Sequence, residues 1–297
     1  NNAIVCGYGS AWQPAACANM GLPTRPSLDA GRIAYGGTRS ISGWETPVLG
    51  GLFVASNGQI NQLVGRNSTP VPGAAGQVFM LSEEPRIRGN TVMFTGSGSG
   101  GRVGIYAVPA SGGPVALVMD QTSAHNATGT IGTFYAPSFD GVNTAFTVRM
   151  NASTSRAIFR TEWSGRVKVA ESSMGLPGLA APISLGNEPS IFGVRTFFTA
   201  SKDSGTAAEQ SVLFMHSRDP NSPTYTRVIG TGDALDGRTV RTVSIGRDGF
   251  DGAFIAIRVI FTNGASGVYA SRLPSQGGAF NPTMTVAAAR PAGSTLS

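Results

Sequence analysis

Short apolar runs recur along the whole chain, and each is bounded by Gly, Pro, Asn or Ser. The runs are rich in β-branched and aromatic residues, and no window keeps a helical period of apolar positions. This pattern predicts short β-strands joined by tight turns. The predicted strands are residues 32–35, 51–54, 61–64, 91–94, 103–108, 115–119, 144–146, 157–159, 167–170, 196–198, 212–215, 226–229, 254–257, 267–270 and 283–287.

A turn-and-strand phrase repeats five times and groups these strands into units. It begins at Pro26, Pro85, Pro137 and Pro189 and, in a degraded form, at Asp248, so the steps are 59, 52, 52 and 59 residues. A fixed period of this size indicates one supersecondary unit that is repeated. A second register supports the first, because the middle strand of each unit carries an aromatic residue at Phe53, Tyr106, Phe159, Phe214 and Tyr269.

The repeat also predicts the fold. The short segment around each repeated proline adds a fourth strand to every unit. A single four-stranded antiparallel sheet cannot bury both faces, whereas sheets stacked radially bury one another. We therefore expect an all-β chain that forms a β-propeller of four-stranded antiparallel blades, with five blades, or six as the alternative. The expected parts are an N-terminal cap at 1–21 and one propeller domain at 22–297, with blades at about 22–79, 80–134, 135–184, 185–244 and 245–297.

The order of motifs within the unit resembles a known family. A proline and turn are followed by a strand that ends in an aromatic residue, a strand of the Gly-Ile-Tyr type (104–106) and a strand near Leu-Val. This order resembles the WD40-like propeller repeats of TolB-type proteins, and it is more similar still to uncharacterised secreted proteins with tandem Pro-Ser-x-x-Gly…Phe…Gly-x-Tyr units. The resemblance covers roughly residues 22–290. TolB-like rings commonly have six blades, and a sixth blade here would be formed by residues 1–21 or by sequence beyond this chain. The resemblance implies a propeller but no particular activity, because propellers host binding, scaffolding and catalysis alike.

Composition narrows the location and partners of the chain. Hydrophobic residues make up 41%, but no run approaches the roughly 18–20 apolar residues that a membrane-spanning helix needs. Charged residues make up only 13%, and a surface built from Ser, Thr, Asn, Gln and Gly is common in extracellular proteins. The net charge is +6, with Lys168 and Lys202 as the only lysines among 22 basic residues. The arginines either cover strand surfaces or hold anionic groups; they do not cluster with aromatics, so we expect no nucleic-acid partner.

The N-terminal region suggests a secreted protein. Cys6 and Cys17 lie close together in the sequence, and a Cys6–Cys17 disulfide would suit an oxidising compartment; two unlinked buried thiols are the alternative. The chain starts at Asn1 without an apolar leader, so we expect any signal peptide to be already removed. Three N-x-S/T sequons at Asn67, Asn126 and Asn151 are candidate glycosylation sites, and glycosylation would require them to lie in exposed loops.

Metal and cofactor chemistry are not expected. His125 and His216 are the only histidines and lie far apart in the sequence, and no Cys, His or Asp spacing fits a metal site. Both histidines are expected to pack in the core or lie at the surface. Residues 96–101 match G-x-G-x-x-G, but they lie between two predicted strands and open no helix, so we interpret them as a hairpin loop.

Carboxylates offer the one candidate for catalysis. The position before each repeated proline is Arg25, Glu84, Ala136, Glu188 or Arg247, and Asp248 follows. In a closed ring these side chains would converge at one end of the central channel. Glu84, Glu188 and Asp248 could then supply the acid and base or nucleophile of a glycosidase. The flanking Arg25 and Arg247 would instead neutralise them in a structural ion network, or bind the acidic groups of a polysaccharide. Asp29, Asp140 and Asp251 belong to the repeated turn, where Asp stabilises the turn itself.

Exposed tryptophans are the remaining candidates for ligand binding. Trp44 and Trp163 lie outside the repeated core positions, so their indoles could stack on sugar rings, although half-buried packing is the commoner role of Trp. Our leading interpretation is a secreted, non-catalytic recognition or surface-structural module that binds carbohydrate. A polysaccharide hydrolase or lyase is the first alternative, and a protein-binding scaffold or self-assembling filament subunit is the second.

Overall fold

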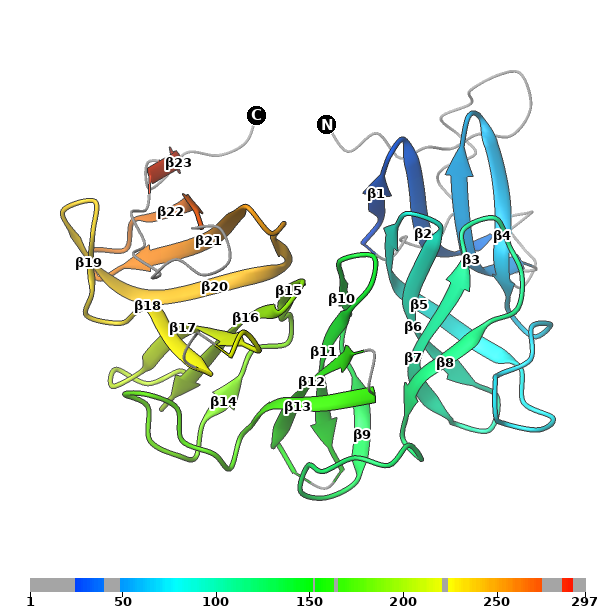
Figure 1. Cartoon of the computed structure of the whole chain (residues 1–297), viewed down its shortest axis with the longest axis horizontal. Helices are drawn as coiled ribbons and strands as arrows, with labels where there is room; N and C mark the ends of the chain where they lie inside the picture. Colours follow the sequence, from blue (N-terminus) through cyan, green and yellow to red (C-terminus); the bar gives the residue numbers. More distant parts are fainter. Residues whose placement is uncertain are drawn as a thin grey trace. The chain divides into compact units, whose positions relative to one another are not determined.

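Five antiparallel sheets follow one another along the described part of the chain (Figure 1). The computed structural model describes residues 25–37, 50–151, 153–162, 165–220 and 224–273, and the backbone of 38–39, 49 and 285–290. Within these residues the regular structure is β throughout, which confirms the all-β prediction. Accordingly, the described residues include no helix that could cross a membrane.

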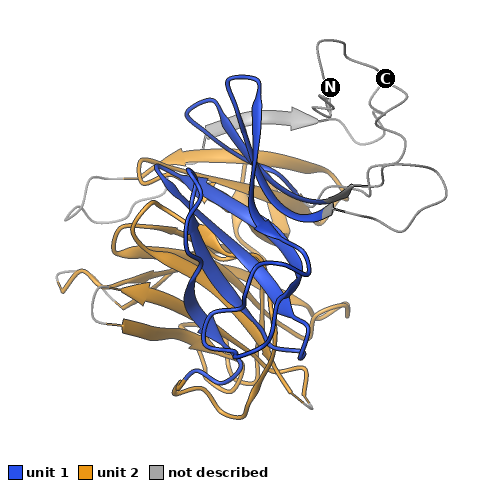
Figure 2. Cartoon of the chain, turned by 90° about the vertical axis from the view of Figure 1, so that its right-hand side faces the viewer, with its two compact units in different colours: residues 1–123 blue, residues 124–297 orange. Residues whose placement is uncertain are grey.

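Two sheets make up the first compact unit, residues 1–123 (Figure 2). In both, the strands pair in chain order. The first sheet consists of β1 (Ser27–Asp29), β2 (Arg32–Arg39), β3 (Leu49–Ser56) and β4 (Gln59–Gly65). The second sheet consists of β5 (Phe79–Arg88), β6 (Thr91–Gly98), β7 (Val103–Pro109) and β8 (Ala116–Asp120). The G-x-G-x-x-G segment covers the end of β6 and the first part of the β6–β7 turn, so it belongs to a β-hairpin and opens no helix, as expected.

Three sheets make up the second compact unit, residues 124–297. The third sheet contains β9 (Ile131–Phe134), β10 (Ser138–Phe139), β11 (Thr144–Met150), β12 (Arg156–Glu162) and β13 (Gly165–Glu171). The fourth contains β14 (Ser184–Leu185), β15 (Ser190–Phe192), β16 (Arg195–Lys202), β17 (Gln210–Ser217) and β18 (Tyr225–Gly230). The fifth contains β19 (Ala234–Leu235), β20 (Arg238–Phe250), β21 (Phe254–Phe261), β22 (Ser266–Arg272) and β23 (Thr285–Arg290). β9 and β10 both pair with β11, and β14 and β15 both pair with β16, so each pair forms one interrupted edge.

Neighbouring sheets bury their faces against each other within each unit. In the fourth sheet, Phe198 and Phe214 pack toward Ile158 of the third sheet. The adjacent Phe197 belongs to a second cluster, with Ile257 of the fifth sheet. Successive side chains of a strand point to opposite faces, so the Phe-Phe pair contributes to both interfaces. A sheet covered on both faces accounts for continuous apolar runs in place of a simple polar–apolar alternation.

The predicted strands agree with the observed ones, and each predicted segment lies within or overlaps a strand. The strands that carry the repeated phrase were predicted least completely. β5 and β20 are long, yet they include Pro85 and Asp248, which indicate turns in a sequence. A register shift between Glu83 and Arg86, and another between Ile245 and Phe250, absorb these residues within the strands. β-Bulges of this kind cannot be recognised from hydrophobic period alone.

Candidate functional site

Four of the five positions that precede the repeated phrase fall at bulges or gaps of the strands that carry it. Glu84 lies in the bulge of β5 with a φ of +50°. Ala136 and Glu188 lie in the gaps between β9 and β10 and between β14 and β15, and Arg247 lies in the bulge of β20. A bulge changes the direction of a side chain relative to the regular strand, so these positions are distinguished from their neighbours by backbone geometry as well as by sequence.

The charged residues at these positions are paired. Arg25 Nε lies 3.3 Å from Glu84 Oε2, with side chains 57% and 26% exposed. The carboxylate of Glu188 lies beside β20, 4.0 Å from the position that a Cβ on Gly246 would take. Arg247 is buried, and Glu188, Arg247 and Asp248 each have an interaction partner.

The predicted catalytic carboxylates are divided between the two units. Glu84 belongs to the first unit, and Glu188 and Asp248 belong to the second. The pairing of Arg25 with Glu84 is the interaction expected of a structural ion network. The catalytic role of the three carboxylates stays a prediction.

A buried serine after the repeated proline connects successive sheets. Ser138 Oγ accepts a hydrogen bond from Ile191 N at 3.1 Å and donates one to the Arg247 carbonyl at 2.7 Å. In the first unit, Ser27 Oγ accepts a bond from Ile87 N at 3.1 Å. The serine at this position of the repeat therefore bonds a backbone N–H of the following sheet in both compact units. Sequence reasoning noted the Pro-Ser repeat but missed this role.

The repeated aspartate also reaches the next sheet. Asp140 stabilises its own turn, and its Oδ2 accepts a bond from Gly193 N at 2.7 Å. Asp29 Oδ2 accepts the equivalent bond from Gly89 N at 2.9 Å. The predicted structural role of these aspartates is therefore confirmed, and it extends beyond the turn.

Several predicted residues lie outside the described part of the chain: Trp44, Trp163, Cys6 and Cys17. Their roles in ligand stacking and in a disulfide stay predictions. The sequon residues Asn67, Asn126 and Asn151 are described, and all three are exposed, as glycosylation requires. The amide of Asn151 is engaged, however, because its Nδ2 donates to the Ile131 carbonyl at 3.3 Å and to Thr130 Oγ1 at 3.4 Å.

Both histidines pack against aromatic rings, as expected. The His125 ring centroid lies 6.0 Å from that of Phe159. His216 is buried, with its ring 5.2 Å from Tyr225. Burial, together with the charges of Arg160 and Arg218, lowers the pKa of His216 to about 4. An imidazole with so low a pKa is neutral at pH 7 and serves packing.

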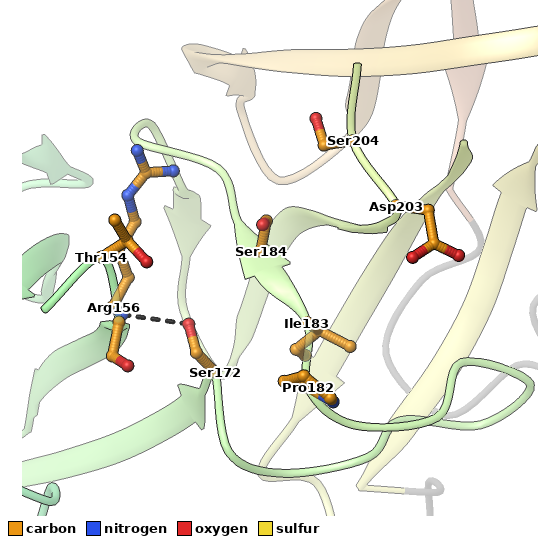
Figure 3. Close-up of a pocket in the computed structure, with 9 residues that line it drawn as sticks. Thr154, Arg156, Ser172, Pro182, Ile183, Ser184, Asp203 and Ser204 are labelled. Atoms are coloured by element: carbon orange, nitrogen blue, oxygen red, sulfur yellow. Dashed lines mark hydrogen bonds between the residues drawn. The ribbon is translucent and has the colours of Figure 1, made fainter. Parts of the chain in front are cut away.

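A polar pocket lies between the third and fourth sheets (Figure 3). It has a volume of about 420 Å³, which lies within the usual range of small-ligand sites. Its walls come from the β11–β12 loop, the segments after β13 and before β14, and the β16–β17 loop. The lining residues are Thr154, Ser155, Arg156, Ser172, Pro182, Ile183, Ser184, Asp203 and Ser204. Sequence analysis did not predict this site, because its residues come from loops that share no motif.

The polar groups at the floor and at the rim of the pocket differ in their exposure to solvent. At the floor, Ser172 is buried and its Oγ accepts a bond from Arg156 N at 3.0 Å. At the rim, Ser184, Asp203 and Ser204 are exposed. Figure 3 shows Arg156 and Asp203 on opposite sides, with Ser184 between them. The arrangement offers hydroxyl groups that donate and accept hydrogen bonds, and one carboxylate that accepts them.

Neither a protein-family model nor a curated protein sequence matches this chain. Solved structures resemble it. The β-propeller domain of the Trilobed protease from Pyrococcus furiosus aligns with a TM-score of 0.49 and 8% identity over 88% of this chain and 69% of that one. A putative TolB from Agrobacterium tumefaciens has a TM-score of 0.46 and 13% identity over 90% and 81%. An α-L-arabinanase from Penicillium chrysogenum, complexed with arabinobiose, has a TM-score of 0.42 and 13% identity over 86% and 79%. One fold can host many unrelated functions, so the ligands and substrates of these proteins do not identify those of this chain.

Proposed function

We propose that this chain is a secreted, non-catalytic recognition module that binds carbohydrate in the pocket between the third and fourth sheets. The observation that carries the proposal is the lining of that pocket, which contains five hydroxyl side chains, one carboxylate and one guanidinium. Sugar hydroxyls act as donors and acceptors at once, and Ser and Thr hydroxyls can complement either role. Loops held by rigid sheets are also the usual place for binding residues.

The absence of a second carboxylate in this pocket favours binding over hydrolysis. Most glycoside hydrolases use two carboxyl groups on either side of the scissile bond. Asp203 is the one carboxylate among the nine described residues that line the pocket. Glu84, the first residue of the alternative catalytic set, is paired with Arg25. These observations support recognition without turnover.

We infer further that the five sheets are the blades of a closed propeller, and that Cys6 and Cys17 are joined in a disulfide. The inter-sheet bonds from Ser27 and Ser138 support the propeller, because the same bond recurs between successive sheets of each unit. Peptide mapping without reduction tests the disulfide, and a Cys6–Cys17 linked peptide is the expected result.

A printed glycan array with the purified chain tests the proposed function. Binding to at least one glycan is expected, followed by confirmation of the affinity by calorimetry. Ser184→Trp fills the pocket and is expected to abolish that binding. The matched control is Ser244→Trp, at an exposed position on β20 away from the pocket lining.

Three results would contradict the proposal. They are an empty array, binding that survives Ser184→Trp, and release of reducing ends or unsaturated products from a bound polysaccharide. The last result would favour the hydrolase or lyase, and the variants Glu84→Gln, Glu188→Gln and Asp248→Asn would then identify the carboxylates involved.

A further inference from the structure

We propose that the pocket selects neutral sugars over acidic ones, and that Asp203 is the residue that determines this selectivity. The inference rests on the proposed function and specifies the class of ligand. It depends on the balance of charge at the pocket, where Arg156 would attract a sugar carboxylate and Asp203 would repel it.

Part of the Arg156 guanidinium is already used by the protein. Its Nη1 donates to the Leu185 carbonyl at 2.6 Å, and its Cζ lies 5.5 Å from the centroid of the Tyr135 ring. Its backbone N–H is held by Ser172 Oγ. Its Nε has no hydrogen-bond partner among the described residues but is buried, so a ligand does not reach it, and an acidic ligand at Nη1 would have to compete with the Leu185 carbonyl. Arg156 therefore acts mainly as a wall of the pocket.

The carboxylate of Asp203 belongs to an exposed residue at the rim of the pocket. None of the described residues donates a hydrogen bond to it or forms an ion pair with it. Its backbone is nevertheless held in place, because the Asp203 carbonyl accepts bonds from Thr206 N at 3.1 Å and Thr206 Oγ1 at 2.7 Å. The carboxylate of Glu209, near the end of the same loop, accepts a hydrogen bond from Gly205 N. The loop thus presents one carboxylate at the rim on a fixed backbone.

An unpaired carboxylate beside hydroxyl groups suits a neutral sugar. Its two oxygens can accept bonds from two adjacent sugar hydroxyls, and such bonds to a charged acceptor are stronger than neutral ones. A uronic acid would bring a second negative charge to the same rim, and like charges disfavour binding. Asp203 is therefore expected to favour binding of a neutral sugar and to disfavour binding of a uronic acid.

The test compares matched sugar pairs on the intact chain. The probes are D-glucose with D-glucuronate, D-galactose with D-galacturonate and D-mannose with D-mannuronate, measured by saturation-transfer NMR and calorimetry. Asp203→Asn keeps the shape of the side chain, and Asn also tolerates the φ of +53° at this position. The matched control is Glu83→Gln, which removes an exposed carboxylate that does not line the pocket.

The variant should weaken the affinity for the neutral sugar without weakening the affinity for the acidic one. We expect the neutral member of a pair to bind better to the natural chain, and Asp203→Asn to weaken its affinity about tenfold. The same variant should leave binding of the acidic member unchanged or strengthen it, and Glu83→Gln should change neither. A natural chain that prefers the acidic member, or equal effects of Asp203→Asn on both members, would overturn the inference while leaving carbohydrate binding intact. Failure of every sugar, here and on the array, would instead overturn the proposed function itself.

Discussion

Ser190 Oγ accepts a hydrogen bond from the backbone N–H of Phe250 at 3.0 Å, across a sequence separation of 60 residues. The same hydroxyl donates to the Arg247 carbonyl at 3.2 Å. Ser190 is fully buried, so the Phe250 N–H depends on this side chain, whereas the Arg247 carbonyl also accepts a hydrogen bond from Ser138 Oγ. Ser27 and Ser138 occupy the same place in the repeat, and each accepts the same kind of hydrogen bond from a backbone N–H of the following sheet. One hydroxyl therefore joins successive sheets where hydrophobic packing alone would leave buried backbone groups unpaired.

Ser190→Ala should destabilise the second unit substantially. The variant removes two hydrogen bonds and leaves the Phe250 N–H buried without its partner. A buried donor left unsatisfied costs about 1–3 kcal/mol, and we expect a loss of that size in the free energy of unfolding measured with guanidinium. Ser244→Ala, at an exposed position of β20, should stay within about 0.5 kcal/mol of the natural chain. Equal stabilities of the two variants would show that the inter-sheet bond contributes little.

Glu171 should stabilise the protein at neutral pH and lose that effect in acid. Burial alone would raise its pKa, but bonds from Lys168, Thr128 and Ser173 outweigh burial and lower the pKa to about 2. Because the pKa of Glu171 is lower in the folded state, the charged carboxylate adds its full share to the free energy of unfolding above about pH 4.5. That share is lost as the pH falls toward 2.

We expect Glu171→Gln to reduce the free energy of unfolding at pH 7 by about 2 kcal/mol and to differ less from the natural chain at pH 2.5. Urea unfolding at both pH values measures the effect, with Glu83→Gln as the control at an exposed carboxylate. A deficit of the same size at pH 2.5 would mean that the charge of Glu171 is irrelevant.

His216 should make the protein less stable in mild acid. Its pKa is lowered to about 4 from an ordinary value of 6.5 by burial and by the charges of Arg160 and Arg218. Between these values the unfolded chain binds a proton that the folded chain excludes, so stability falls as the pH drops from about 6.5 to 4. A loss on the order of 1–2 kcal/mol between pH 7 and pH 5 is expected.

Replacing His216 with Gln tests this origin of the pH dependence. The variant is expected to be less stable at pH 7, because a buried ring that packs on Tyr225 is lost, but its stability should change less between pH 7 and pH 5. Guanidinium unfolding at the two pH values measures both quantities. An unchanged pH dependence in His216→Gln would assign the effect to other groups.

Gly132 should be required for the position of the β11–β12 loop. A Cβ at Gly132 would lie 2.3 Å from Asn151 Oδ1, so Gly132→Ala must displace the amide that bonds β9. Thr154 and Ser155 of this loop line the pocket. We expect faster hydrogen exchange in residues 151–156 of the variant and weaker glycan binding. Gly37→Ala is the matched control, because a Cβ there meets nothing within 4 Å; equal exchange in the two variants would contradict the role of Gly132.

The sequence determined the all-β fold class and the strands of each unit, because alternation, β-branched content and turn residues are local properties that a repeat displays several times over. It also identified the turn role of Asp140. Only the tertiary structure decided that Asp140 and Ser138 bond the following sheet, since those partners lie more than fifty residues away. The existence and the lining of the pocket could be recognised only in the tertiary structure. Arg156 and Asp203 come from loops of different sheets, and residues without a shared motif become neighbours only when sheet packing brings their loops together.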